Sequence, residues 1–355
     1  MLSINLYNSK AEKILPSLKN FDSLVCDPPA GISFMGHEWD SDRGGRAKWI
    51  EWMTGMMRLS LDALKPGAHC LVWAFPRTSH WTATALEDAG FEIRDRVSHI
   101  FGKGWNKSKH FLKPCMEDWW LCRKPIEEKN VEENIAKWGT GGIFAERCRI
   151  PLNPEYGDKR SFGSGRWDTT KSFSLYGKYN QEAKNIFASG DGRWPANVTH
   201  DGSDEVIAMF PHTKSGSGAI IKEGKNTGAA WGKESRKVGT ELPSYGDEGS
   251  ASRFFYCSKA SPKDRDEGCG DNDHPSVKST NLMRWLIKLI TPEEGHVLDC
   301  FMGTGSTGKA AVLEGMSFTG IEQDSHYFDI ARKRIGFVAD KNQIMYNPIN
   351  VIQNS

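Results

Sequence analysis

The sequence predicts an α/β protein whose doubly wound, mostly parallel sheet carries an irregular inserted module. Near the N-terminus, short apolar runs alternate with segments of helical periodicity, and the same alternation returns near the C-terminus. Between them, about 127–250, the chain is rich in Gly, Ser, Asn, Lys, Arg and Trp and shows little sustained periodicity. One sheet assembled from both ends, with the middle inserted, accounts for these observations.

The N-terminal alternation begins with residues 23–27 (SLVCD), an apolar run that ends in an acid followed by Pro28-Pro29, as a buried strand stopped by prolines would. In 46–64, apolar residues recur at spacings of three and four, which predicts an amphipathic helix that ends at Lys65-Pro66-Gly67. The next predicted elements are a strand at 69–75, a helix at 78–89 that ends at Gly90, and a strand at 91–101.

The C-terminal alternation contains a glycine-rich turn. The predicted elements are a helix at 281–290, a strand at 296–300, the loop FMGTGSTG, a helix at 306–314, a strand at 317–322 and a helix at 326–335. We therefore divide the chain into a first half of the core (1–126), an inserted module (127–250), a second half of the core (251–340) and a tail (341–355).

Composition narrows the function classes. The net charge is +1, so a nucleic-acid partner must be sought in local patches. The eight cysteines form no C-x-x-C pair and no compact zinc spacing, so we expect free thiols and no metal. The start of the chain lacks the apolar segment of a signal peptide, and no apolar run approaches the ~20 residues that span a bilayer. We expect a cytoplasmic protein with no membrane partner; a homodimer remains open.

The glycine loop at 303–308 is the strongest local signal. Glycines at 303, 305 and 308 let a ligand approach the backbone, and the helix that follows supplies free N–H groups. Glu322 ends the next strand, 19 residues after Gly303, about where an acid accepts hydrogen bonds from a ribose in nucleotide folds. Residues 303–309 also fit the start of a phosphate-binding loop, but Ala310 stands where that loop needs a hydroxyl. A turn without a ligand is the third alternative.

A second element, Asp27-Pro28-Pro29-Ala30, follows a predicted strand. Prolines stiffen the turn and leave carbonyl groups unpaired at the carboxyl edge of the sheet, where ligands of α/β proteins bind. A ring amine is a poor nucleophile because its lone pair is delocalised. A carboxylate and a carbonyl that accept its two N–H bonds would turn the lone pair toward a methyl donor. A strand end capped by an aspartate is the alternative.

Together these elements resemble the DNA amino-methyltransferases of the permuted, β-type motif order. In that family a D-P-P-Y motif lies near the N-terminus, and H-P-x-x-K-P and F-x-G-x-G motifs lie near the C-terminus. This chain has Asp27-Pro28-Pro29, then His274-Pro275-Ser276-Val277-Lys278, then Phe301-Met302-Gly303-Thr304-Gly305. The stretch 27–40 and Ser252-Arg253-Phe254-Phe255-Tyr256-Cys257 resemble the phage and prophage branch. The resemblance covers roughly 1–125 and 250–337 and implies a Rossmann-like methyltransferase sheet.

The resemblance also implies site residues. Asp27 and the Pro28 carbonyl would hold the target amine, within a catalytic set of Asp27, Pro28, Pro29, Ala30 and Phe34. S-adenosylmethionine would be the cofactor, with Glu322 on its ribose and the 274–278 segment on its opposite side. The full cofactor-binding set is Asp299, Phe301, Gly303, Gly305, Thr307, Glu322, His274, Lys278 and Ser279.

Three positions depart from the family pattern. Ala30 replaces the aromatic residue that stacks on the flipped base, and Phe34 or Trp39 could supply the missing ring. Ser279 replaces the second proline of H-P-x-x-K-P. Ser9-Lys10 stands where many members have Gly-Asp beside the cofactor's adenine. These departures put base stacking and the adenine pocket in question.

Double-stranded DNA is the expected partner. An enzyme that modifies a base amine must flip the base and hold the backbone meanwhile. Residues 101–113 place lysines around a tryptophan with no acid, and basic and aromatic residues recur in the middle module. The predicted DNA contacts are Lys103, Trp105, Lys107, Lys109, Arg193 and Trp194. For any one of them, an ordinary solvated surface is the alternative.

We therefore predict a site-specific DNA methyltransferase that methylates adenine N6 and belongs to a restriction-modification or phage system. The inserted module would recognise the target sequence. Cytosine N4 is the near alternative, because Asp at 27 favours adenine only by family tendency. An inactive DNA-binding relative and a P-loop NTPase are the alternatives of other classes. Methylation of cytosine C5 is disfavoured, because Pro114-Cys115 follows a basic loop rather than a strand.

Overall fold

The computed structural model describes residues 1–102, 104, 109–110, 112–151, 192–214, 248–259, 261, 263–347 and 349–353. The chain forms two compact units. The first contains Met1–Cys148, Asn197–Val206 and Cys257–Ser355, and the second contains Arg149–Ala196 and Ile207–Tyr256. The first unit therefore joins both ends of the chain, and it holds all the strand–helix alternation predicted above.

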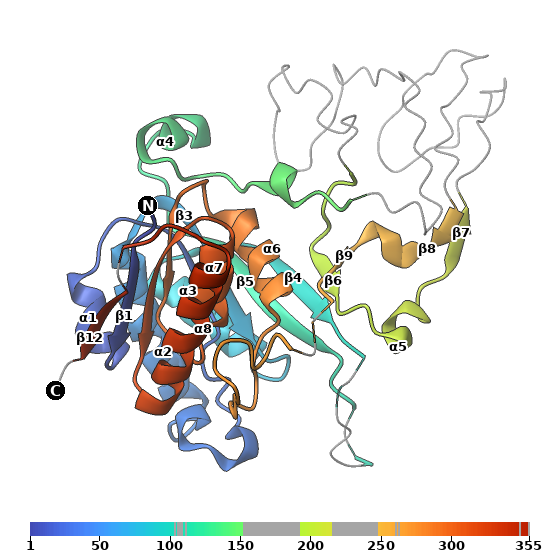
Figure 1. Cartoon of the computed structure of the whole chain (residues 1–355), viewed down its shortest axis with the longest axis horizontal. Coiled ribbons are helices and arrows are strands. Elements are labelled where there is room, and N and C mark those ends of the chain that lie inside the picture. Colours follow the sequence, from blue (N-terminus) through green and yellow to red (C-terminus); the bar gives the residue numbers. More distant parts are fainter. Residues whose placement is uncertain are drawn as a thin grey trace. The chain divides into compact units, whose positions relative to one another are not determined.

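The described residues form one large sheet (Figure 1). Its strands run parallel from one edge to β3, whereas β5 is antiparallel to both of its neighbours, β3 and β4. In spatial order the strands are β12 (Asn350–Gln353), β1 (Ile4–Asn8), β11 (Ser317–Glu322), β10 (His296–Asp299), β2 (Phe21–Cys26), β3 (Leu64–Ala74), β5 (Met116–Arg123), β4 (Glu92–Ile100), β6 (Val198–His200) and β9 (Tyr256–Cys257).

Helices cover both faces of this sheet, as the doubly wound prediction requires. On one face α1 (Ala11–Ile14), α2 (Arg46–Ala63) and α3 (Ser79–Ala89) bury apolar residues in one core cluster that includes Leu24 and Cys26 of β2. The alternate residue of β2, Ser23, faces the other side and bonds Thr291 at 2.8 Å. That side carries α6 (Thr280–Ile290), α7 (Ser306–Leu313) and α8 (Ser325–Lys341), coloured orange to red in Figure 1.

Some elements differ from their predicted bounds. Lys65-Pro66-Gly67 lies inside β3 instead of in a separate turn, because α2 passes directly into the strand at Leu64. The last helix continues to Lys341. The short strands β1 and β12 and the strand β5 were not predicted as elements. Parallel pairing with β11 and β12 puts β1 inside the sheet, a long-range contact that no local pattern reveals.

The predicted irregular region begins with ordered structure that packs in the first unit. Helix α4 (Val131–Trp138) starts at Asn130, whose side chain accepts from the Glu133 N–H at 2.8 Å, and it ends at the left-handed Gly139. In the second unit β7 (His212–Lys214) and β8 (Glu248–Ser250) form an antiparallel pair. Arg253, in the 3₁₀ turn η8 (Ala251–Phe254), ties the two strands together through Thr213 and Gly249.

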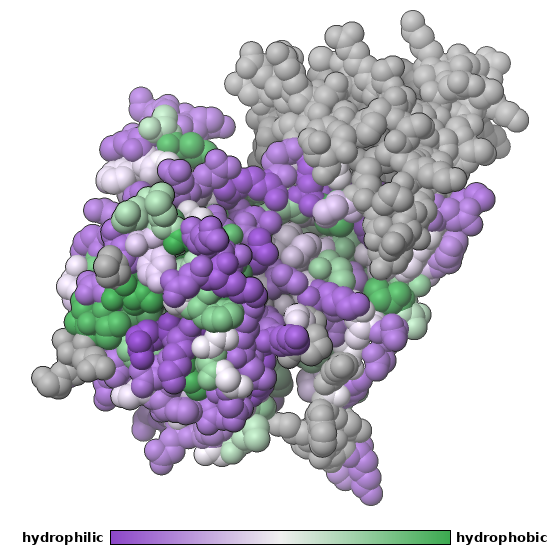
Figure 2. Space-filling view, in the orientation of Figure 1, coloured by the Kyte–Doolittle hydropathy of each residue, from purple (hydrophilic) through white to green (hydrophobic). Residues whose placement is uncertain are grey.

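In the part of the chain that the structure describes, no helix has the length and apolar character needed to cross a membrane. The face seen in Figure 2 is largely hydrophilic, with apolar side chains in small separate patches.

Candidate functional site

A cavity of ≈ 1990 Å³ lies in the first unit where the parallel strands end. Carboxyl ends of parallel strands are the usual ligand site of such sheets. Its walls come from the residues that follow β1, β2, β10 and β11, and from the segment before α6. Of the predicted catalytic and cofactor residues, it is lined by Asp27, Pro28, Pro29, Ala30, Phe34, His274, Lys278, Asp299, Phe301, Gly303, Thr307 and Glu322.

The glycine loop forms one wall of the cavity. Gly303 has φ +52° and its N–H donates to Glu322 Oε2 at 2.8 Å. Gly305 has φ +79° and does not line the cavity; a Cβ there would lie 2.9 Å from that of Ala331 on α8. The first glycine therefore lets the loop approach the cavity, and the second lets the loop pack on α8.

Two carboxyl groups lie beside this loop. Glu322 ends β11, and its second oxygen accepts from the Asp324 N–H at 2.8 Å. Asp299 ends β10 and accepts from the Phe301 N–H at 2.9 Å. Burial raises the pKa of both carboxyls above the ordinary value, and that of Asp299 reaches about 7. Both carboxyls can still accept further hydrogen bonds, because each oxygen has two lone pairs.

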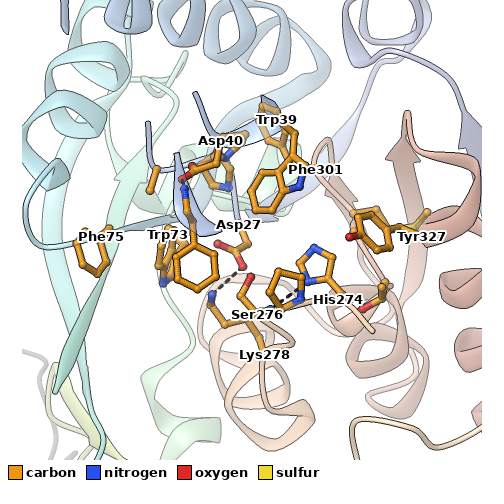
Figure 3. Close-up of a pocket in the computed structure, with 18 of the residues that line it drawn as sticks. Asp27, Trp39, Asp40, Trp73, Phe75, His274, Ser276, Lys278, Phe301 and Tyr327 are labelled. Carbon is orange, nitrogen blue, oxygen red and sulfur yellow. Dashed lines mark hydrogen bonds and ion pairs between the residues drawn. The ribbon is translucent and has the colours of Figure 1, made fainter. Parts of the chain in front are cut away.

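Asp27 stands directly after β2 and opposite the segment before α6. Its Oδ2 lies 2.7 Å from the Lys278 ammonium, which also lies 3.8 Å from Glu117 Oε2. Burial raises the pKa of Asp27 above its ordinary value, while Lys278 opposes that rise. In Figure 3, Asp27 points into the cavity between Trp73 and Phe75 on one side and His274 and Tyr327 on the other.

The loop after Asp27 is held in a constrained form. Ala30 is buried, and its carbonyl accepts from the Thr78 hydroxyl at 2.8 Å. Buried Asp40 accepts from the N–H groups of Gly31 at 3.0 Å and Phe34 at 2.8 Å. Both neighbours of Phe34 in the chain adopt left-handed backbone, with φ 51° at each. Asp40 thus stabilises a strained turn that presents Phe34 to the cavity.

Stacked rings form the wall near His274. The Trp39 ring lies 6.0 Å from that of His274, almost parallel to it, and Tyr327 meets His274 edge-on at 4.6 Å. Burial, with Lys278 and Arg265 nearby, lowers the pKa of His274 to about 4. At neutral pH this wall is therefore uncharged. Trp39, one of the two predicted substitute rings, lies on this wall.

The remaining predicted residues have other positions. Ser279 precedes α6, and its hydroxyl donates to the Ser258 carbonyl at 3.2 Å, outside the cavity lining. Lys103, Trp105 and Lys107 lie outside the described residues. Lys109 is exposed in a turn. Arg193 and Trp194 belong to the second unit, where the Arg149 guanidinium lies 5.2 Å from the Trp194 ring.

The phosphate-binding alternative fails on geometry. Lys309, the residue that would reach a phosphate, is 1% exposed. Its ammonium lies 2.7 Å from Asp264 and 2.8 Å from Glu267. A lysine enclosed by two carboxylates is not available to a phosphate at the loop. The enclosed Lys309 therefore argues against the P-loop NTPase alternative.

Sequence reasoning missed several cavity residues, among them Glu117, Trp73, Asp40 and Tyr327. Trp73 and Glu117 come from neighbouring strands, and their pairing depends on β5 running antiparallel to β3. The apolar and aromatic run 119–122 after an acid could have indicated that strand. Asp40 could have been suspected because it closes a glycine-containing loop directly after Asp27.

Pro114 and Cys115 lie between the basic 101–113 segment and β5, whose first residue is Met116. Both residues line the cavity, and Cys115 is exposed. Among the described residues, no three His, Cys, Asp or Glu side chains are grouped to hold a metal ion.

Comparisons with known proteins agree with this geometry. A family model described as DNA methylase, covering N6 and N4 methyltransferases, matches residues 21–333. The Type II methyltransferase M.BglI of Bacillus subtilis is 40% identical over 303 residues, which cover 81% of this chain and 73% of that protein. The Type II methyltransferase M.HindIII of Haemophilus influenzae is 42% identical over 74 residues, 21% of this chain and 23% of that protein.

Among solved structures, the PvuII DNA methyltransferase (cytosine-N4-specific) is similar with a TM-score of 0.50 and 13% identity, covering 99% of this chain and 96% of that one. This similarity concerns the fold and confirms the predicted methyltransferase sheet. The family match extends over most of the chain, from β2 into α8, and includes the ends of β2, β10 and β11 that line the cavity. The chain belongs to the N6/N4 DNA methylase family.

Proposed function

We propose that this enzyme, a DNA methyltransferase that uses S-adenosylmethionine, transfers the methyl group to adenine N6 in double-stranded DNA. The observation that carries the proposal is the position of Asp27. It lies in one cavity with the glycine loop and Glu322, at the side where the Trp73 and Phe75 rings lie, and Phe34 lines the same cavity. A methyl donor and a flipped base could therefore meet at this carboxylate.

The loop side of the cavity suits the cofactor. Gly303 leaves its backbone open to a ligand, and a Cβ there would have only His274 Nε2 near it, at 3.8 Å. We assign the ribose hydroxyls to Glu322, and the methionine end to Phe301, Asp299 and Thr307. His274 covers the cofactor from the other side. When bound, S-adenosylmethionine supplies an electrophilic methyl group on a sulfonium sulfur.

The other side of the cavity suits a base. We assign the two amine N–H bonds to Asp27 Oδ1 and to the carbonyl of Pro28. Lys278 engages Oδ2, so Oδ1 faces a ligand without giving up the ion pair. When the nitrogen lone pair bonds the methyl carbon, the carbon–sulfur bond would break and leave its electron pair on the sulfur. The methylated nitrogen must then lose a proton, and an ionised Asp27 can accept it. Phe34 stacks on the base in place of the aromatic residue missing at Ala30.

We assign the DNA contacts to the 101–113 segment and to the inserted module. We assign phosphate contacts to the 101–113 segment, with Lys103, Lys107 and Lys109 around Trp105, because a basic segment close to the cavity can hold the backbone of a flipped nucleotide. Gly104, Leu112 and Lys113 from this segment line the cavity. We assign sequence recognition to the inserted module, with Arg193 and Trp194. The similarity to Type II methyltransferases supports a role in a restriction-modification system, and the 27–40 motif supports the phage branch.

Mass spectrometry of nucleosides tests the proposal. Unmethylated duplex DNA is incubated with the protein and labelled S-adenosylmethionine, then digested to nucleosides. Labelled N6-methyladenine is the expected product. N4-methylcytosine would leave the family assignment intact and correct the base. Cofactor binding without any labelled nucleoside, on DNA of varied sequence, would favour an inactive DNA-binding relative.

A further inference from the structure

Lys278 reaches across the cavity to three neighbouring strand ends. Asp27 follows β2, Trp73 lies near the end of β3, and Glu117 lies near the start of the antiparallel β5. The Lys278 ammonium is 2.7 Å from Asp27, 3.8 Å from Glu117 and 4.2 Å from the centre of the Trp73 ring. Figure 3 shows it directed at Asp27.

The partners of Lys278 are themselves fixed. Trp73 Nε1 donates to Glu117 Oε2 at 2.8 Å, so the indole and the carboxylate hold each other in place. The Lys278 side chain is 11% exposed and that of Glu117 14%, whereas that of Asp27 is 25% exposed. The ammonium is therefore held by enclosed groups, and it presents one N–H to the more open carboxylate.

We propose that Lys278 is a positioning residue for methyl transfer, which holds the Asp27 carboxylate ionised and leaves its Oδ1 toward the target amine. This inference rests on the proposed function of Asp27. It also explains why a cation stands beside the residue that must accept an amine N–H. If Asp27 were protonated, its O–H would face the amine as a donor, and the carboxyl would have one oxygen fewer to accept the amine N–H.

The charges around Asp27 show what Lys278 opposes. Burial raises the pKa of Asp27, and the nearby carboxylates of Glu117 and Asp40 raise it further; Asp299, at the end of β10, also interacts with Asp27 as a like charge. Lys278 lowers it by charge and by hydrogen bonding. For Lys278 itself, burial lowers the pKa, but Asp27 and then Glu117 outweigh burial and raise it. The lysine therefore stays charged where the carboxylate needs it.

Three variants separate this role from a structural one. Lys278→Met removes the charge and keeps most of the length, Lys278→Arg keeps the charge, and Glu117→Gln removes a neighbouring negative charge. The rate of a single methyl-transfer turnover is measured from pH 5 to pH 9 at saturating cofactor. We expect Lys278→Met to move the acid limb of the profile upward by about 1–3 pH units, the effect of losing a close opposite charge. Lys278→Arg should keep the wild-type limb, and Glu117→Gln should move it downward.

A uniform loss of rate at every pH in Lys278→Met, with the limb in place, would overturn the proposal. The second measurement needs no activity: ¹³C NMR of aspartate-labelled protein follows the Asp27 carboxyl, assigned by its absence in Asp27→Asn. Its titration should move upward in Lys278→Met. An unchanged Asp27 titration in Lys278→Met contradicts the role of Lys278. If the titration moves in Lys278→Met but the wild-type protein transfers no methyl group to DNA, only the proposed function is contradicted. If Lys278→Met fails to fold, the acid limb of the Glu117→Gln profile decides: a downward move supports the proposal, and an unmoved limb contradicts it.

Discussion

At the scale of single residues, Glu322 is both a predicted ligand of the cofactor and a support of the glycine loop. Its two oxygens accept from the N–H groups of Gly303 and Asp324, each at 2.8 Å. The sequence spacing predicted the first role. The second depends on the parallel pairing of β11 with β10, which brings the carboxylate under the loop.

Glu322→Ala should weaken S-adenosylmethionine binding by about 1–3 kcal/mol, the scale of hydrogen bonds to a charged group. Isothermal titration calorimetry gives the affinity, and thermal unfolding of the free protein reports how far the loop itself is loosened. ATP with magnesium should not bind tightly, because Lys309 is enclosed. Unchanged cofactor affinity in a folded Glu322→Ala protein would remove Glu322 from the site.

Asp299 should make the free protein less stable as pH rises from about 4 to 7. Burial raises the pKa of its carboxyl from 3.8 to about 7, so in this window the folded protein binds a proton that the unfolded chain has lost. Stability from this group is complete below the unfolded pKa and declines until pH passes the folded pKa, by an amount on the order of 4 kcal/mol.

Asp299→Asn should flatten that decline, since the amide oxygen can still accept from Phe301 N–H and does not titrate. Urea unfolding at pH 4, 5.5 and 7 compares the slopes. Equal slopes in the wild type and in Asp299→Asn would show that Asp299 titrates normally in the folded protein.

At the scale of elements, the loop that follows Asp27 is the feature that sequence and structure describe most differently. The sequence placed Phe34 near Ala30, but it did not reveal that Asp40 folds back and fixes the loop through backbone N–H groups. Two non-glycine residues with φ 51° flank Phe34, and such backbone persists only when its surroundings enforce it. The loop therefore presents the ring as a preformed feature.

Phe34→Ala should slow methyl transfer on paired duplex DNA. The activation free energy should rise by about 1–3 kcal/mol, the value of a base stacked on an aromatic ring. The loss should be smaller when the target base is mispaired, because flipping then costs less. Phe34→Leu is the matched control, since it keeps apolar packing in the loop but removes the aromatic face. Equal losses on both substrates would indicate that Phe34 packs under the loop without stacking.

Elements of the site were predictable where local pattern decides them. The Asp27 turn and the glycine loop each follow a strand that an apolar run in the sequence predicts, and both line the cavity. The Lys278–Glu117 contact was not predictable in the same way, because it joins a loop residue to a residue of β5, a strand that the sequence analysis did not predict. The ordered helix α4 was also missed, although Asn130 and Gly139 mark its ends.

At the scale of the whole molecule, the two ends of the chain share one sheet and the middle supplies a second compact unit. The parallel pairings of β2 with β10 and of β1 with β11 join the two ends. This arrangement lets the catalytic and cofactor motifs, which are distant in sequence, line one cavity.

Exchanging residues 149–196 and 207–256 for the equivalent segments of a relative should change the methylated sequence while cofactor affinity stays the same. The reason is that the cavity lining lies entirely in the first unit. Sequencing that detects methylated bases, together with calorimetry, gives both results. Methylation at the original sites after the exchange would place recognition elsewhere, with the 101–113 segment as the next candidate.

The central claim is that Asp27 acts on the base amine and not on the cofactor. The direct test compares Asp27→Ala with Glu38→Ala. Glu38 is a carboxylate in the same loop, but it does not line the cavity. Transfer of a labelled methyl group to duplex DNA and calorimetric binding of S-adenosylmethionine are measured for both. We predict that Asp27→Ala loses transfer by at least about 10²–10³-fold, the cost of removing a group that stabilises the transition state, while it binds the cofactor almost normally. Glu38→Ala should keep both properties, and near-normal turnover in Asp27→Ala would contradict the account.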